Sequence, residues 1–539
     1  MLTTAICFAT LPSRASICSD ARRQGAIMKT GTGRKSGGRR LLLAQLIMAQ
    51  LAVIASPSGG AVRADPGAIL NTALAQAQQA FRRGDCASVL GNLSPIITGR
   101  EFPSLPDRTR SSALFMASLC EAQTSRFDEA LLHIRAATTL PAAPAEFWIA
   151  RLRIEIYSAN PADAVSTLEK LQRGIPGALS RLEVTWLHAL NRRLKGMPSG
   201  AAARDRLLAF VSDPAFVAAR YDPGFEYMFL DNARRLAISG DRAGAQAQVD
   251  RLSSHVALIT ASLDPALRFA VPPDYDMRAA TRREIAHLER LSAERPSLLA
   301  LVIAQAEAHR AINEPDKALA LLLSAAPEGS LAPMFTDRAA KLNWWWDELA
   351  STYAHLGRYD DAVAALKSGM KVGEHGNFNV SQLLNLASLQ LRLGKPQDAL
   401  DTLAGQETAL GAGSSPYGKM VYRRIHGCAA KRTGKADIAA QDFAYALAHR
   451  QDEPSNLVAI QLCMGDLDGA AASIIARLDN PEERGDALRD LSTYEDWPAN
   501  IPPSPDLAAD ASLLARPDVR AAIERAGGIR IFNVLPRAL

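Results

Sequence analysis

The sequence predicts an all-α protein, an αα-hairpin solenoid with a short C-terminal cap. The first observation is composition: 48% of the 539 residues are hydrophobic and only 6% are aromatic, with alanine and leucine dominant and β-branched residues scarce. That balance favours helices over strands. The second observation is a short motif that recurs along the chain, which is typical of solenoids that stack one hairpin on the next.

Residues 1–64 are interpreted as a leader and signal peptide. From Met28 the chain reads MKTGTGRKSGGRR, then an apolar run of 15 residues (Leu41–Ala55) and a small-x-small sequence at 62–64. This order predicts an exported protein, periplasmic or secreted, cleaved at the Ala64–Asp65 bond. A membrane anchor is the alternative, but 15 residues are short for a span of about 20. A chain starting at Met28 would carry the whole signal.

Removing the leader reverses the sign of the net charge. The chain has 61 basic and 56 acidic residues, of which residues 1–64 hold nine and one, so 52 basic and 55 acidic residues remain, a net charge of −3. Nucleic-acid binding needs an excess of positive charge that the mature chain does not have. We therefore expect no nucleic-acid partner, and no stable membrane span after cleavage.

Four cysteines follow the leader, in two pairs: Cys86 with Cys120, and Cys428 with Cys463. Within each pair the spacing is about one repeat, so each pair could bridge neighbouring repeats in an oxidising compartment. Four reduced, buried cysteines at alanine-like positions are the alternative. The chain contains no CxxC and no Cys/His cluster, so we expect no metal site and no cofactor.

The recurring motif is a small or turn residue followed, five positions later, by alanine. Its clearest copies are GRYDDA (357–362), GKPQDA (394–399), GKADIA (434–439) and GDLDGA (465–470). Ten copies can be aligned, and their final residues mostly lie 31 to 44 residues apart. One gap of 73 residues follows Ala245 and leaves room for a degraded unit around Asp276–Arg295.

The best copy resembles the tetratricopeptide repeat (TPR), a 34-residue helix–turn–helix. The matching residues are Trp346, Leu349, Ala350, Tyr353, Gly357, Tyr359, Ala362 and Leu366. The resemblance covers most of residues 70–490 and implies a right-handed superhelix of hairpins. Small residues let the two helices of a hairpin approach, and stacking of hairpins buries the remaining apolar face.

Five segments follow from the pattern. They are the leader (1–64), divergent helical repeats (65–270), an irregular junction (271–297), a TPR array (298–490), and a final segment (491–539). The final segment is expected to contain a Pro-rich break, two capping helices and an extended tail.

Three adjacent tryptophans, Trp344, Trp345 and Trp346, stand at the start of the best copy. Consecutive helical residues are turned by 100°, so the three rings cannot face the same way. Trp346 occupies the packing position of the repeat and is expected in the core, and Trp345 is expected to pack toward a neighbouring repeat. Trp344 either faces the groove or covers the irregular stretch before it.

The resemblance also implies a groove that binds a protein or peptide partner. Its candidate residues are Trp344, Asp347, Glu348, His355, Asn385, Arg392, Arg424 and Lys431. The last four would suit a terminal carboxylate, because a fixed set of donors matches its two oxygens. The Lys–Asn pair that such clamps use within one helix is absent, and ordinary solvated polar faces are the alternative.

No catalytic motif emerges. There is no HExxH and no GxSxG, and a P-loop-like stretch ending at Lys419 has Met420 where a hydroxyl is needed. We therefore predict a non-enzymatic scaffold or adaptor in the bacterial cell envelope. The alternative is a glycan-binding protein, or an accessory subunit of an envelope glycan-processing enzyme, with Trp344 and Trp345 stacking on sugar. A cytoplasmic scaffold would require that residues 41–55 are not a signal.

Overall fold

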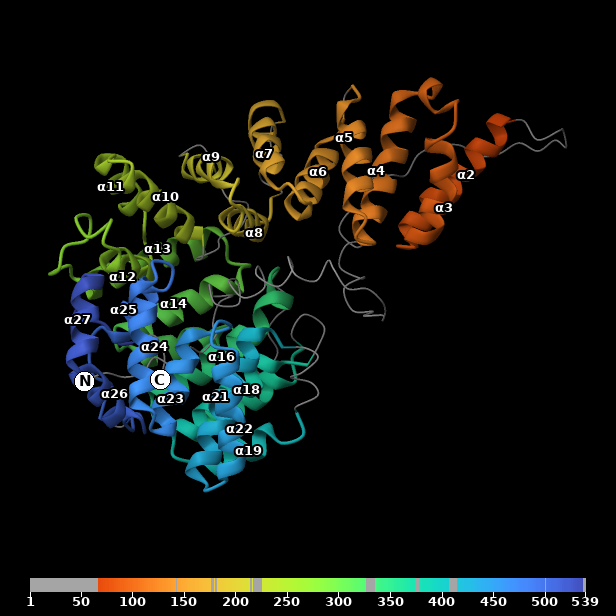
Figure 1. Ribbon diagram of the computed structural model, residues 1–539. Coiled ribbons are helices and arrows are strands. Elements are labelled where there is room, and N and C mark those ends of the chain that lie inside the picture. The colour runs from red at the N-terminus through yellow and green to blue at the C-terminus, as the bar shows by residue number, and fades with distance from the viewer. Residues whose placement is uncertain are drawn as a thin grey trace. The chain divides into compact units, whose positions relative to one another are not determined.

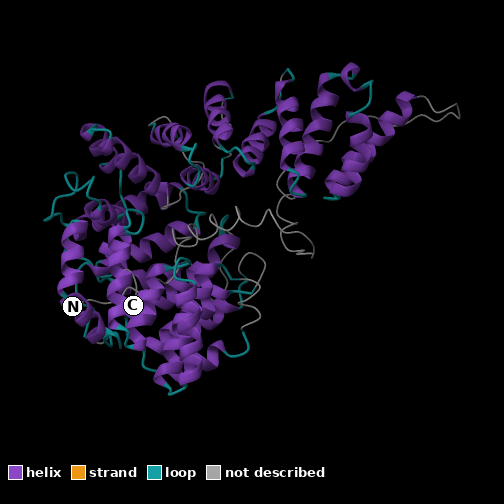
Figure 2. Ribbon diagram, in the orientation of Figure 1, coloured by secondary structure: helices purple, strands orange, loops and turns teal. Residues whose placement is uncertain are grey.

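The computed structural model describes residues 66–141, 143–175, 179, 182–213, 216, 225–325, 335–373, 378–406, 414–499 and 501–536. The expected leader and its cleavage site lie outside these residues. Within them the chain forms 25 α-helices, one short 3-10 helix and no strand, apart from a single bridge between Thr493 and Ile531. Figure 2 shows the helices joined by short loops. The predicted all-α solenoid of αα-hairpins is confirmed.

The chain divides into two compact units near residue 220. The first unit, coloured orange to yellow in Figure 1, contains four hairpins. Their helices are α2 (Pro66–Arg82), α3 (Cys86–Ile97), α4 (Asp107–Gln123), α5 (Phe127–Thr139), α6 (Ala145–Tyr157), α7 (Ala162–Gly174), α8 (Val184–Lys195) and α9 (Ala201–Ser212), with the 3-10 helix η2 (Phe102–Ser104) before α4. Phe115 stacks on Phe147 at 4.1 Å and joins the second hairpin to the third.

The second unit holds the remaining helices, coloured green to blue in Figure 1. They are α10 (Glu226–Ile238), α11 (Arg242–Val249), α12 (His255–Leu263), α13 (Met277–Glu294), α14 (Leu299–Ala311), α15 (Pro315–Ser324), α16 (Arg338–His355), α17 (Tyr359–Met370), α18 (Val380–Arg392), α19 (Pro396–Leu403), α21 (Pro416–Arg432), α22 (Ala436–Ala448), α23 (Pro454–Met464), α24 (Leu467–Asp479), α25 (Arg484–Leu491), α26 (Leu507–Ala515) and α27 (Pro517–Ala526).

The structure divides the chain at a different place from the sequence pattern. The division falls near residue 220 rather than at 270, and most of the expected irregular junction, 271–297, is the 18-residue helix α13. Asp276 caps this helix by accepting a hydrogen bond from the amide of Ala279, and one face of the helix is buried. With α12 it fills the 73-residue gap between clear copies of the motif.

The motif encodes the turn inside each hairpin. In eight of its ten copies the first residue adopts a left-handed conformation, with φ of 74° at Gly357 and 62° at Asn313, whereas Gly196 has φ of −78°. The amide of the next residue then bonds back to the first helix, as Arg358 does to the carbonyl of Tyr353 at 2.9 Å, which ends the helix and turns the chain. The alanine five residues on, such as Ala362, is fully buried where the two helices touch. In one weak copy Ala201 is exposed and Ala203 is buried instead.

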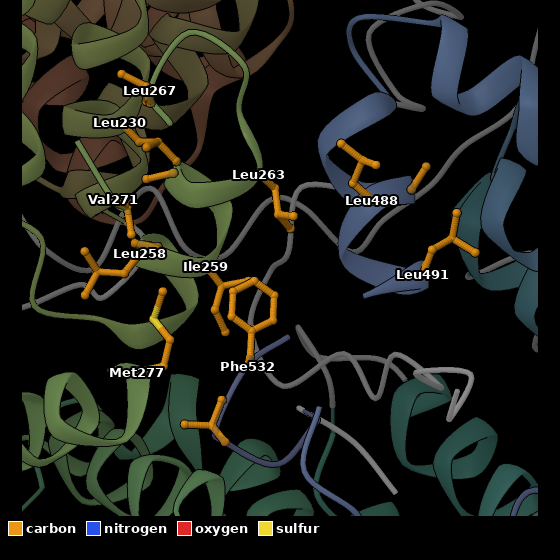
Figure 3. Packing of buried hydrophobic residues seen from close by; sticks show 14 of the residues in the cluster. Leu230, Leu258, Ile259, Leu263, Leu267, Val271, Met277, Leu488, Leu491 and Phe532 are labelled. Atoms are coloured by element: carbon orange, nitrogen blue, oxygen red, sulfur yellow. The ribbon is translucent and has the colours of Figure 1, made fainter. Parts of the chain in front are cut away.

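The last helices of the second unit pack back on its first ones. One hydrophobic cluster combines residues of α10 to α14 with residues of α23 to α27, and α12 lies beside α25 (Figure 1). Figure 3 shows Ile259 and Leu263 of α12, Leu488 and Leu491 of α25, and Phe532 in this cluster. The predicted pair of capping helices is confirmed as α26 and α27.

Two non-helical stretches complete this unit. The Pro-rich segment (residues 493–499 and 501–506) joins α25 to α26, and the C-terminal arm (residues 528–536) follows α27. Their backbones pair at one end, where the amide of Phe532 donates to the carbonyl of Thr493 at 2.9 Å. The amide of Leu535 then donates to the carbonyl of Ala311 at 2.8 Å, so the arm is fixed to the end of α14.

Candidate binding face

The three tryptophans of α16 belong to a packed core. Trp345 is 3% exposed, and its indole nitrogen donates to the carbonyl of Leu322 at 3.3 Å, so it packs toward the preceding hairpin as expected. Trp346 is half-buried and lies against Gly369 of α17. Trp344 is half-buried against the same hydrophobic cluster. The run of rings is therefore mainly packing.

The predicted groove residues lie on the first helices of successive hairpins. We call this surface the first-helix face; its residues are Arg310 on α14, Asp347, Glu348 and His355 on α16, Asn385, Ser388 and Arg392 on α18, Arg424, Lys431 and Arg432 on α21, and Asn456 on α23.

Many of these side chains bind one another across neighbouring hairpins. Arg310 donates two hydrogen bonds to the carboxylate of Glu348, at 2.6 and 3.0 Å, with both side chains buried. Asn385 donates to Asp347 at 2.5 Å. Arg424 donates to Asn456 at 2.7 Å. Arg424 also donates to the hydroxyl of Ser388 on α18 at 3.4 Å, so polar contacts link α14 to α23 in succession. These contacts stabilise the stacking of the hairpins.

Burial shifts the titration of two groups on this face. The pKa of Asp347 is raised to about 7, chiefly by loss of solvation, while the bond from Asn385 opposes that shift and the charge of Glu348 adds to it. The pKa of His355 is lowered to about 3 by burial and by the charge of Arg310. His355 is therefore neutral, and its Nε2 lies 3.0 Å from Oδ1 of Asn313.

Arg392 differs from the other cations of the face. It is 4% exposed, and neither terminal nitrogen of its guanidinium has a hydrogen-bond partner among the described residues. Burial lowers its pKa to about 10, which leaves it charged at neutral pH. Arg432 and the exposed Lys431 follow at the end of α21, so this part of the face is cationic.

The four residues expected to hold a carboxylate are therefore in different situations. Asn385 and Arg424 are engaged with neighbouring hairpins, whereas the buried donors of Arg392 have no acceptor in the part of the chain that the structure describes, and Lys431 is exposed. Whether they bind a ligand stays a prediction.

The Pro-rich segment places further residues on this face that the sequence pattern did not predict. The ring of Trp497 meets the ring of His355 edge to face, with centroids 5.2 Å apart. Ile501 is 7% exposed in the cluster that contains Trp345. Asp506 accepts a hydrogen bond from Arg432 at 2.7 Å. The only hint of these contacts in the sequence was the presence of two large apolar residues, Trp497 and Ile501, in a Pro-rich segment.

The described residues contain neither a metal-binding cluster nor a membrane-spanning helix. No group of three or more His, Cys, Asp or Glu side chains is arranged to hold a metal ion there. Among the helices that the structure describes, none is long and apolar enough to cross a membrane.

Comparison with known proteins gives no family assignment. No family model matches the chain, and no curated protein matches it. Among solved structures, the yeast Tom70 matches 85% of this chain over 100% of its own, at 10% identity and a TM-score of 0.33. The APC/C hetero-tetramer Cut9-Hcn1 matches 85% of this chain and 90% of its own, at 14% identity and a TM-score of 0.26.

A third solved structure, Naa15/Naa10 bound to HypK-THB, matches 85% of this chain over 96% of its own, at 11% identity and a TM-score of 0.23. Scores this low add no argument to what the hairpins, their left-handed turns and their buried alanines show directly. The fold is a TPR-like αα-solenoid.

Proposed function

We propose that this protein is a non-enzymatic scaffold or adaptor that binds a protein or peptide in the bacterial cell envelope. The observation that carries the proposal is Arg392, whose buried terminal nitrogens have no acceptor among the described residues. Burial of such donors is costly unless an acceptor reaches them. A carboxylate of a partner suits a guanidinium, because its two oxygens match the planar donors.

The surroundings of Arg392 support an acidic partner. Arg432 and Lys431 add positive charge at the end of α21, and Arg432 already pairs with Asp506 of the same chain at 2.7 Å. Fold alone does not assign function, so the proposal rests on this local chemistry.

The envelope location is supported by the signal-peptide pattern and by the cysteines. Cys86 is joined to Cys120 between α3 and α4, and Cys428 to Cys463 between α21 and α23, with Cα atoms 5.0 and 5.8 Å apart. Disulfides persist in oxidising compartments and are rare in the cytosol. Fractionation of cells, with sequencing of the mature amino terminus, tests the location; an intact leader in the cytoplasm would overturn it.

The binding proposal is tested by affinity capture from envelope extracts. The bait is the chain from Asp65, compared with an Arg392→Gln, Arg424→Gln variant. The matched control is Lys367→Gln, Lys371→Gln, which removes one exposed cation in the last turn of α17 and another at its C-terminal end. A protein held by wild type and control but lost from the face variant supports the proposal, provided that the variant keeps its helical circular dichroism. Equal capture by all three would refute it.

The glycan-binding alternative has no specific support in the structure. It relied on Trp344 and Trp345 as stacking rings, and Trp345 is buried with its indole nitrogen bonded to the backbone. Retention of the chain on isolated envelope glycan, without any protein partner, would bring that alternative back.

A further inference from the structure

The Pro-rich segment crosses the first-helix face without helix or strand structure, and it turns where the amide of Ile501 donates to the carbonyl of Pro498. We propose that this segment is an internal ligand of that face. The partner would be an extended peptide that displaces it by presenting an aromatic ring, an aliphatic side chain and a carboxylate in the same order. The inference rests on the proposed function and names the chemistry of its partner.

The first contact is aromatic. Trp497 packs edge to face on His355, a residue at a groove position of α16, and joins the cluster that contains the α16 tryptophans. Because the pKa of His355 is strongly lowered, its ring is neutral and suits an aromatic neighbour. The indole nitrogen of Trp497 is buried and makes no hydrogen bond among the described residues, so the ring contributes through packing.

The second contact is aliphatic. Ile501 is one of the buried members of the cluster built by α14 to α18, which also contains Trp345 and Leu349. Burying such a side chain contributes roughly 1.5–3 kcal/mol in general. The third contact is ionic, since Asp506 pairs with Arg432 beside the cationic end of the face. The three side chains are four and then five residues apart in the sequence.

The segment is held in a way that allows exchange. Between Asp496 and Asp506, the backbone hydrogen bonds among the described residues are local, such as the amide of Ile501 to the carbonyl of Pro498 at 2.9 Å. None of them ties this stretch to the repeats. Helices α25 and α26 tether its two ends, so a displaced segment remains close and competes at high effective concentration.

Prolines suit this role. Four prolines, at 498, 502, 503 and 505, restrict the backbone of the segment. A chain whose backbone is already restricted loses little conformational entropy on binding, which is the general advantage of Pro-rich recognition peptides. Recognition therefore depends on the side chains of Trp497, Ile501 and Asp506.

The test uses a labelled synthetic peptide of residues 493–506, TYEDWPANIPPSPD, added to the chain from Asp65. In the wild type the face is already occupied, so binding measured by fluorescence anisotropy should be weak. In an opened variant, Trp497→Ala with Asp506→Asn, the peptide should bind about tenfold more tightly or better, because the tethered competitor is weakened. A peptide with alanine at the three contact positions is the peptide control.

A third protein checks the site of binding. Adding Arg432→Gln to the opened variant removes the partner of the peptide carboxylate and should weaken binding again by about tenfold. Adding Lys371→Gln instead, an exposed cation at the end of α17, should change nothing. Equal binding to wild type and opened variant, or no binding to a folded opened variant, would overturn the inference.

Folding and function are separated in the design. If the double variant loses its helical circular dichroism, Asp506→Asn alone is used, and a smaller gain in peptide affinity, about threefold, is the expected result. Since the peptide is the chain's own sequence, this measurement needs no cellular partner. A negative anisotropy result would overturn the inference and would leave the affinity capture unaffected. A negative capture result would overturn the proposed function and would leave the anisotropy measurement unaffected.

Discussion

The side-chain amide of Asn385 donates to Oδ1 of Asp347 over 2.5 Å and joins α18 to α16 inside the first-helix face. Both side chains are buried, so the contact takes the place of water on two groups that a peptide-binding groove would normally present. It links the stacking of two hairpins to the ionisation of one carboxyl group.

Stability should fall as pH rises through neutrality, in part because of Asp347. Its pKa is raised from 3.8 to about 7 in the folded chain, so the folded state holds a proton that the unfolded state releases. The resulting stabilisation is complete below about pH 4 and is lost as pH rises through 7. Asp347→Asn should remove that part of the dependence. Urea unfolding at pH 5 and 8 would show it as a change in the difference between the two free energies.

The matched control for this prediction is Asp361→Asn, which removes an exposed carboxylate of α17 that pairs with Arg358. It should leave the difference between pH 5 and pH 8 unaltered. One pKa unit corresponds to about 1.4 kcal/mol, so the effect at Asp347 is a few kcal/mol at most. The same pH dependence in wild type and Asp347→Asn would contradict the raised pKa.

Breaking the buried ion pair between Arg310 and Glu348 should lower the free energy of unfolding far more than replacing both residues by apolar ones. Glu348→Gln leaves a buried guanidinium without its counter-charge, and we expect a loss of roughly 3–5 kcal/mol in the free energy of unfolding. Arg310→Met combined with Glu348→Leu should recover most of that loss, since no charge is left unpaired. Denaturant titration of Arg310→Met, of Glu348→Leu and of the double variant measures the coupling. Additive losses would argue against the pair.

Replacing Trp345 should destabilise the fold more than replacing Trp344, because Trp345 is more deeply buried. Trp345→Ala removes a ring that is 3% exposed and should lower the free energy of unfolding by roughly 3–5 kcal/mol, through the cavity left in the cluster. Trp344→Ala removes a half-buried ring and should cost clearly less. Thermal unfolding of the two variants beside wild type decides the order. A larger loss at Trp344 would show that the wrong ring has been placed in the core.

Gly394 at a hairpin turn should stabilise the fold only through its backbone conformation, not by leaving space for a neighbouring atom. Gly394 has φ of 72° and no atom within 4 Å of where a Cβ would stand, so Gly394→Ala introduces strain without a clash. We expect a loss of about 1 kcal/mol. Gly485 in α25 also has open space but no positive φ, so Gly485→Ala should stabilise by roughly 0.5–1 kcal/mol. Melting temperatures that shift in the same direction for both variants would be inconsistent with this reasoning.

The disulfides should each stabilise their own pair of hairpins. Replacing Cys428 and Cys463 together by alanine opens a loop of 35 residues, and we expect a loss of roughly 2–4 kcal/mol. Reduction of this variant should then lower its melting temperature further through the remaining Cys86–Cys120 bond. Peptide mapping under non-reducing conditions should recover both linked pairs. Free thiols at all four positions in exported protein would disprove the pairing.

The local pattern of the sequence determined the hairpins. A turn residue that tolerates positive φ, followed by alanine five positions later, specifies both the end of one helix and the close contact with the next, so Gly357 and Ala362 were sufficient to predict their hairpin. The same rule predicted room for a degraded unit after Ala245, where α12 and α13 lie. It placed a boundary at 270, where Pro272 and Pro273 resemble a linker, whereas the structure divides the chain near residue 220 and packs the adjacent α13 on both neighbours.

Only the tertiary structure decided which residues cover the first-helix face. Repeat register predicted that Asp347, His355 and Arg392 share one side of the first helices, since that depends on positions within a helix. It did not predict that Asp347 binds Asn385 or that Trp497, 142 residues beyond His355, packs on that ring. Such contacts join segments that are distant in sequence and form only when stacking brings them together. The sequence therefore determines the hairpins, while the closure of the second unit determines which of its polar groups remain available to a partner.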